Sequence, residues 1–244
     1  LAKKMNLISF KSSNYSKKAR NKGKIKFLII HYTGMQSVRA SINRLTNPRY
    51  KVSCHYLIDR KGKIFQMVED NKIAWHAGKS KWQKLNNLND SSIGIELANK
   101  GHRFGYQKFP KKQINVLVKL CLKLKKKYRI KNHFILGHSD IAPLRKFDPG
   151  EKFPWYDLKK RKIGIWYSSN KKIPLPNNFN EATFRKNFFK NLYKIGYRYF
   201  NKNKPQKTDK LVIKSFQRRF RQKKIDGKID LECIKISANL AKNS

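Results

Sequence analysis

The chain has 244 residues and a formal net charge of +45, from 59 Lys and Arg against 14 Asp and Glu. With 39% hydrophobic and 12% aromatic residues it can bury a core, which excludes a disordered basic tail. No apolar run reaches the roughly 18 residues of a membrane-spanning helix, so we expect no transmembrane segment. The three cysteines, Cys54, Cys121 and Cys233, are far apart and predict neither a disulfide framework nor a metal clip.

The positive charge is spread along the whole chain rather than gathered on one arm or helix. Such a charge favours any polyanionic partner, while a biased base composition of the coding genome explains the abundance of Lys, Asn and Ile equally well. Because the sequence contains neither a recognition helix nor an aromatic-basic motif, we expect no nucleic-acid partner.

The first two thirds of the chain alternate between predicted strands and helices. Residues 1–24 are polar and predict an extended, loosely packed lead-in. Apolar runs predict strands at 26–32, 53–59, 63–68, 92–97 and 133–136, with a hairpin turn at residues 60–62, and helical periodicity predicts a helix at 110–128. This order indicates an α/β domain that ends near residue 165.

The last third of the chain has a different organisation. Residues 169–180 contain Pro and Asn in a pattern typical of a linker. Beyond them, the spacing of Phe, Leu and Ile predicts helices at 180–194, 207–221 and 230–240, the last with Asp230 as its N-cap. We therefore expect a small three-helix domain over residues 181–244.

One polar, turn-forming segment, Gly137–Gly150, directly follows a predicted strand. It places His138 and Asp148 ten residues apart, within reach of one metal ion, and His31 at the end of the most apolar strand supplies a second imidazole. Each of these residues alone is more often a hydrogen-bonded core histidine or a turn aspartate. Together, two imidazoles and one carboxylate leave a fourth position open to water, as in catalytic zinc sites.

Five motifs, in the same order along the chain, resemble those of the type 2 N-acetylmuramoyl-L-alanine amidases, which are zinc enzymes that share a fold with peptidoglycan recognition proteins. The motifs are His31-Tyr32-Thr33, Ala74-Trp75-His76-Ala77-Gly78, Leu88-Asn89-Asp90, Ser92-Ile93-Gly94-Ile95-Glu96-Leu97 and the segment Gly137–Gly150. The resemblance runs from about Lys26 to Leu158. It implies an α/β catalytic domain over residues 25–168, with a mixed central sheet flanked by helices.

The resemblance also implies a Zn2+ site and the groups around it. His31, His138 and Asp148 match the zinc ligands of the family. Glu96 matches the catalytic glutamate of the Gly-Ile-Glu-Leu motif, and Lys146 matches the catalytic lysine two residues before the ligand aspartate. In chemical terms Glu96 is suited to move a proton and Lys146 to stabilise an oxyanion.

Other residues are assigned to the substrate cleft. His76 and Trp82 lie in segments that line this cleft in the family. His55 alternates with core residues and is either a packed group or a substrate contact. Trp82 and the C-terminal helices resemble the AmiD-type members, in which a small helical domain similar to a peptidoglycan-binding module follows the catalytic domain.

The reaction implied by the resemblance is hydrolysis of the amide between N-acetylmuramic acid, or its 1,6-anhydro form, and L-alanine of peptidoglycan stem peptides, in cell-wall turnover or recycling. The alternative is a non-catalytic peptidoglycan-binding protein, but such proteins typically lack a zinc ligand, and every ligand position is filled here. The expected partners are peptidoglycan or muropeptides. We expect a monomer in the bacterial envelope, periplasmic or associated with the outer membrane through a signal or lipid anchor upstream of Leu1.

Overall fold

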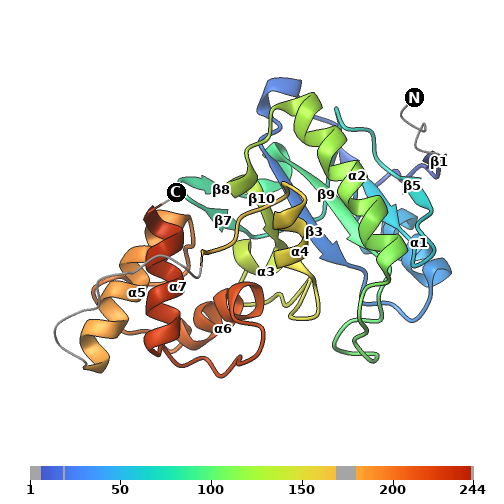
Figure 1. The fold of residues 1–244 in the computed structure, drawn as a ribbon. Helices are drawn as coiled ribbons and strands as arrows, with labels where there is room; N and C mark the ends of the chain where they lie inside the picture. The colour runs from blue at the N-terminus through green and yellow to red at the C-terminus, as the bar shows by residue number, and fades with distance from the viewer. Residues whose placement is uncertain (1–6, 19, 169–179, 243–244) are drawn as a thin grey trace.

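A mixed sheet forms the centre of the structure (Figure 1). In the computed structural model, which describes residues 7–18, 20–168 and 180–242, the six strands of this sheet are ordered β1-β5-β4-β9-β3-β10. They comprise β1 (Leu7–Ser9), β3 (Phe27–Tyr32), β4 (Tyr56–Ile58), β5 (Ile64–Gln66), β9 (Ser92–Leu97) and β10 (Ile135–Gly137). Neighbours run parallel except β4 and β5, which form the predicted hairpin. The predicted mixed α/β architecture is confirmed.

One face of this sheet is covered by the helix α2 (Lys111–Tyr128), as predicted from its periodicity. Alternate residues of β3 point to opposite faces of the sheet. Leu28 and Ile30 pack in the same buried cluster as the apolar side of α2. Phe27 and Ile29 belong to a second cluster on the opposite face. His31 therefore lies on the face away from α2.

The remaining elements are short and surround the sheet. They are the helices α1 (Val38–Thr46), α3 (His138–Ile141) and α4 (Trp155–Lys160), the 3-10 turns Lys22–Lys24, Pro48–Tyr50, Leu88–Ser91 and Asn132–Phe134, and the strand pairs β2 (Tyr15–Ser16) with β6 (Ile73–Ala74) and β7 (Lys81–Trp82) with β8 (Leu85–Asn86). None of the helices within the described ranges has the length and apolarity that crossing a bilayer requires.

The C-terminal helices are α5 (Glu181–Ile195), α6 (Asp209–Phe220) and α7 (Leu231–Lys242), close to their predicted positions. Asp230 caps α7 as expected, since its Oδ1 accepts the N–H of Cys233 at 3.0 Å. α5 and α7 lie side by side (Figure 1). Phe188 and Phe216, fully buried among these helices, belong to the same apolar cluster as Phe27 of β3. The helices thus share a continuous core with the sheet. Of the predicted linker 169–180, all but Asn180 lies outside the described residues.

The lead-in differs from its prediction. β1 adds a parallel strand to the edge of the sheet beside β5, and β2 pairs with β6. Three polar side chains, Ser12, Asn14 and Arg20, are buried. Ser12 Oγ donates to the carbonyl of Leu45 at 2.6 Å, and Asn14 Nδ2 donates to two backbone carbonyls at 3.0 Å each. The lead-in is extended but tightly packed, because its polar groups are satisfied by backbone partners.

Candidate active site

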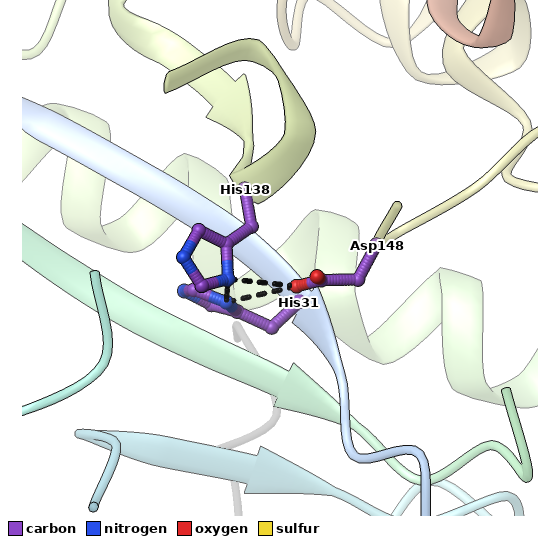
Figure 2. A group of neighbouring side chains, drawn as sticks. All are labelled: His31, His138 and Asp148. Carbon is purple, nitrogen blue, oxygen red and sulfur yellow. Dashed lines mark hydrogen bonds and ion pairs between the residues drawn. The ribbon is translucent and has the colours of Figure 1, made fainter. Parts of the chain in front are cut away.

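Three side chains from distant parts of the sequence converge at one edge of the sheet (Figure 2). The Nδ1 atoms of His31 and His138 are 3.0 Å apart, and Asp148 Oδ2 lies 3.1 Å from each of them. All three residues are buried, with exposed fractions of 1%, 3% and 6%. The structure therefore brings together the three residues that were predicted as metal ligands.

The topology explains why these residues meet. His31 lies near the carboxyl end of β3, and His138 directly follows the parallel neighbour β10, so both project from the same edge of the sheet. The loop that carries Asp148 returns to this point because the N–H of Ser139 donates to the carbonyl of Asp148 at 2.9 Å.

The donor set fits a metal ion. Hydrogen bonds alone do not account for two imidazole nitrogens and a carboxylate oxygen that all face one another, because each neutral imidazole carries a single proton. Tetrahedral zinc ligands on bonds of about 2.0–2.1 Å are about 3.3–3.4 Å apart, close to the spacing seen here. Burial and the neighbouring His138 lower the pKa of His31 to about 4, so this imidazole is neutral at pH 7.

The carboxylate is also in the state that a metal requires. Burial by itself raises the pKa of Asp148, but the electrostatic attraction and hydrogen bond of His138, with those of His31, outweigh it and lower the pKa. Asp148 is therefore ionised at neutral pH.

The far nitrogen of each histidine has a defined partner. His31 Nε2 lies 3.0 Å from His76 Nδ1, and His76 Nε2 lies 3.1 Å from Ser92 Oγ, which donates to the carbonyl of Leu88 at 2.6 Å. This chain is consistent only if His31 and His76 both carry their proton on Nε2, which leaves Nδ1 of His31 free as a ligand. His138 Nε2 likewise faces the carbonyl of Ala77 at 3.1 Å.

Gly94 makes room for this arrangement. A Cβ atom at this position would lie 2.4 Å from Cγ of His76, so the imidazole of His76 rests directly on the backbone of β9. No side chain larger than hydrogen fits there without moving the His76 ring away from His31. The sequence Ser92-Ile93-Gly94-Ile95-Glu96 therefore contains the support for His76 as well as a catalytic candidate.

Glu96 lies beside the metal-ligand cluster. In the parallel pairing of β3 and β9, Glu96 is the register partner of His31, so both side chains project from the same face. Glu96 is 9% exposed, and its Oε2 has no hydrogen-bond partner among the described residues. Burial raises its pKa to about 8, with Asp148 adding to the rise and Lys146 opposing it. Such a carboxyl can both accept and release a proton near neutral pH.

The cluster forms the floor of a cavity of about 590 Å³. Its acidic lining residues are Glu96 and Asp148, and its basic lining residues are Arg44, Arg103, Arg145 and Lys146. Lys146 is half-buried and lies in the same loop as Asp148. The cavity thus combines a metal-ligand set, a proton-transfer group and several cations, a combination suited to hydrolysis of an anionic, amide-containing substrate.

Comparison with known proteins decides the family. The family model for N-acetylmuramoyl-L-alanine amidase matches residues 21–151 of this chain. The chain belongs to the N-acetylmuramoyl-L-alanine amidase family. The matched residues include β3, β9, β10 and every residue of the metal-ligand cluster.

Relatives extend this likeness beyond the catalytic region. N-acetylmuramoyl-L-alanine amidase AmiD of Escherichia coli is 35% identical over 227 residues, covering 86% of this chain and 79% of the relative. The solved complex of E. coli AmiD with anhydro-N-acetylmuramic acid-L-Ala-D-gamma-Glu-L-Lys superposes with a TM-score of 0.78 at 31% identity, over 93% of this chain and 92% of that one. AmpDh3 of Pseudomonas aeruginosa, solved with anhydromuramic pentapeptide, gives a TM-score of 0.78 at 29% identity, over 93% and 94%. These amidases match this chain across its C-terminal helices too.

Two predicted substrate contacts need correction. Trp82 is 1% exposed and does not line the cavity, because its ring packs on Tyr197 at 4.9 Å between ring centroids. His55 is fully buried and accepts the N–H of Gly94 at 3.0 Å through Nδ1, so it is the packed group of the two readings. His76 does line the cavity, where it contacts His31.

Sequence reasoning missed Ser92 and Arg145. Ser92 ends the proton-ordered chain from His31. Arg145 donates to the carbonyl of Ala77 at 2.5 Å and to that of Lys79 at 2.9 Å, so it fixes the carbonyl that His138 also contacts. Both residues lie inside the quoted motifs, and their position next to His76 and His138 was the available signal.

Proposed function

We propose that this chain hydrolyses the amide between N-acetylmuramic acid, or its 1,6-anhydro form, and L-alanine of peptidoglycan stem peptides. The observation that carries the proposal is the buried cluster of His31, His138 and Asp148 with the unpartnered Glu96 Oε2 beside it in one cavity. Membership of the amidase family supports the same reaction.

His31, His138 and Asp148 would hold a Zn2+ ion through two Nδ1 atoms and a carboxylate oxygen. Bound there, zinc supplies a Lewis acid and lowers the pKa of a coordinated water. His76 and the carbonyl of Ala77 keep the two imidazoles in the orientation and tautomer that present Nδ1 to the ion.

Glu96 and Lys146 are assigned the proton transfer and the charge stabilisation. Glu96 Oε2 accepts a proton from the attacking water and returns it to the leaving amine of L-alanine. Its raised pKa suits both steps, because the group is neither a strong acid nor permanently ionised. Lys146, at the cavity wall, would stabilise the negative oxygen that develops on the scissile carbonyl.

The substrate class follows from the relatives and from the charge of the cavity. AmiD and AmpDh3 were solved with anhydromuramic peptides, and such peptides carry carboxylates that suit Arg44 and Arg103 at the cavity wall. We therefore place the activity in cell-wall turnover or recycling, with peptidoglycan or muropeptides as partners. The corresponding location is the bacterial envelope, periplasmic or associated with the outer membrane, and we propose a monomer.

The assignment of the ligands is tested by metal analysis of single variants. His31→Ala, His138→Ala and Asp148→Ala should each lose zinc and activity, whereas His133→Ala, a change outside the cavity, should keep one zinc per chain and full activity. Hydrolysis of a synthetic anhydromuramoyl tripeptide is followed in parallel with zinc content. A ligand variant that keeps both zinc and turnover would remove that residue from the site. Zinc binding with no hydrolysis in the wild type would favour a recognition protein instead.

A further inference from the structure

The short helix α3 (His138–Ile141) carries one proposed metal ligand and holds another. His138 is its first residue, and the N–H of Ser139 donates to the carbonyl of Asp148 at 2.9 Å. A displacement of α3 would therefore move both ligands relative to His31, which lies on the central strand β3. What fixes α3 determines the geometry of the metal-ligand cluster.

The C-terminal helical segment supplies most of these fixing contacts. Asp140, on α3, is 1% exposed, and its Oδ1 accepts the hydroxyl of Tyr197 at 2.5 Å. Its Oδ2 accepts the N–H of Gly137 at 2.8 Å and is ion-paired with Arg219 of α6. Ser215, also on α6, donates its hydroxyl to the carbonyl of Ser139 at 2.7 Å.

Arg219 also ties α3 to the strand before it. It is 2% exposed, and its second guanidinium nitrogen donates to the carbonyl of Ile135 on β10 at 3.0 Å. Its guanidinium carbon lies 4.2 Å from the centre of the Trp155 ring. One side chain of α6 thus contacts the strand and the helix on either side of Gly137, the residue that precedes His138.

α3 has little means of holding its own position. A helix of four residues is too short to be stable by itself. A buried carboxylate such as that of Asp140 is tolerated only when charged or hydrogen-bonding partners surround it. Apart from Gly137, the partners of Asp140 named above come from residues 57 and 79 positions further along the chain.

We propose that the C-terminal helical segment is a structural part of the metal centre, with Tyr197, Ser215 and Arg219 as positioning residues. They hold α3 so that His138 and Asp148 meet His31 at the spacing seen in Figure 2. The inference rests on the proposed metal site. It gives these helices a role in the chemistry itself, separate from any binding of the cell wall.

The test uses two full-length variants that each remove one polar contact across the same interface. Tyr197→Phe deletes only the hydroxyl that Asp140 accepts. Gln222→Ala is the matched control, because Gln222 Nε2 donates to the carbonyl of Phe153 at 2.7 Å and does not touch α3. The zinc dissociation constant of each apoprotein is measured by competition with a chromophoric chelator, and the visible spectrum is recorded after cobalt substitution.

Tyr197→Phe should raise the zinc dissociation constant about tenfold, at the lower end of what loss of an outer hydrogen-bond partner of a metal site costs. It should also change the cobalt absorption spectrum and lower kcat while KM stays unchanged, since Tyr197 does not line the cavity. Gln222→Ala should stay within twofold of the wild type and keep its spectrum. Arg219→Lys should act in the same direction as Tyr197→Phe, and more strongly.

Two results would overturn the inference while leaving the proposed function intact. In one, Tyr197→Phe binds zinc with wild-type affinity and an unchanged cobalt spectrum. In the other, Gln222→Ala weakens zinc binding as much as Tyr197→Phe, which would indicate a general loss of interface stability. If instead the wild-type chain binds zinc independently of His31 and His138, the proposed metal site fails, and the inference fails with it.

Discussion

Replacing His76 by leucine should weaken zinc binding while leaving the metal-free chain folded. His76 Nδ1 is the acceptor for the proton on His31 Nε2, at 3.0 Å. With zinc bound, His31 must present a bare Nδ1 to the metal, so its proton is confined to Nε2 and needs this acceptor. Without zinc, the proton can move to Nδ1, where Asp148 Oδ2 accepts it at 3.1 Å. Loss of the acceptor is therefore felt in the zinc-bound state.

The expected magnitude follows from this asymmetry. A buried N–H group left without an acceptor costs about 1–3 kcal/mol. Because His31 is 1% exposed and the cost falls on the zinc-bound state, the zinc dissociation constant should rise about 5- to 150-fold. His76→Asn is the matched control, since the side-chain oxygen of asparagine stands near the position of Nδ1 and can accept the same proton. Leucine and asparagine are similar in size, so the cavity volume that each change leaves is comparable.

The assay is chelator competition on the two apoproteins, with urea unfolding of each to show that they are folded. The asparagine variant should bind zinc within a few-fold of the wild type, and the leucine variant much more weakly. Equal zinc affinity of the two variants would refute the assigned proton positions, because the reasoning attributes the loss to the acceptor alone.

Three further predictions concern the chemistry and the core. Glu96→Gln should keep zinc and lower kcat about 10²- to 10⁴-fold on an anhydromuramoyl peptide; a near-normal rate would exclude Glu96 as the proton carrier. Lys146→Met should lower kcat about 10²- to 10³-fold. It should also move the acid limb of the pH profile of kcat/KM to higher pH, because Lys146 lowers the pKa of Glu96 and only the ionised Glu96 can act as base; an unmoved limb would separate the two groups. Phe216→Ala should cost about 3–5 kcal/mol in urea unfolding, since Phe216 is fully buried, whereas Leu144→Ala, at a 38% exposed position, should cost under about 0.5 kcal/mol.

Features encoded locally could be predicted from the sequence. The strand pattern around His31, the periodicity of residues 111–128 and the polar segment Gly137–Gly150 each report on their own conformation. Parallel pairing of β3 with β10 then brings His31 and His138 together. The convergence of the metal-ligand set is a consequence of topology that the motifs already implied.

Features that depend on distant segments could not be predicted. Trp82 is covered by Tyr197 and by the backbone of Gly196, where a Cβ atom would lie 2.4 Å from the Trp82 ring. Nothing near Trp82 in the sequence indicates that a segment more than a hundred residues away covers it. An aromatic residue beside a cleft motif was therefore taken for a substrate contact.

Hydropathy also misjudges polar segments that pack through hydrogen bonds. The lead-in contains few apolar residues, yet Arg20 is buried and donates to the carbonyl of Ser92 at 2.6 Å. The C-terminal helices show the complementary error. Their periodicity predicts helices correctly, but it does not reveal that Phe188 and Phe216 share a core with Phe27 of the sheet.

The central claim, a zinc-dependent cut between the muramoyl group and L-alanine, is tested most directly by digesting purified Gram-negative peptidoglycan and identifying the products by mass spectrometry. The digestion is run with the wild-type chain, with a zinc chelator added, and with zinc restored after chelation. We expect free stem peptides that begin at L-alanine, lost on chelation and recovered with zinc. Intact peptidoglycan in all three conditions, or cleavage that chelation does not affect, would contradict the account.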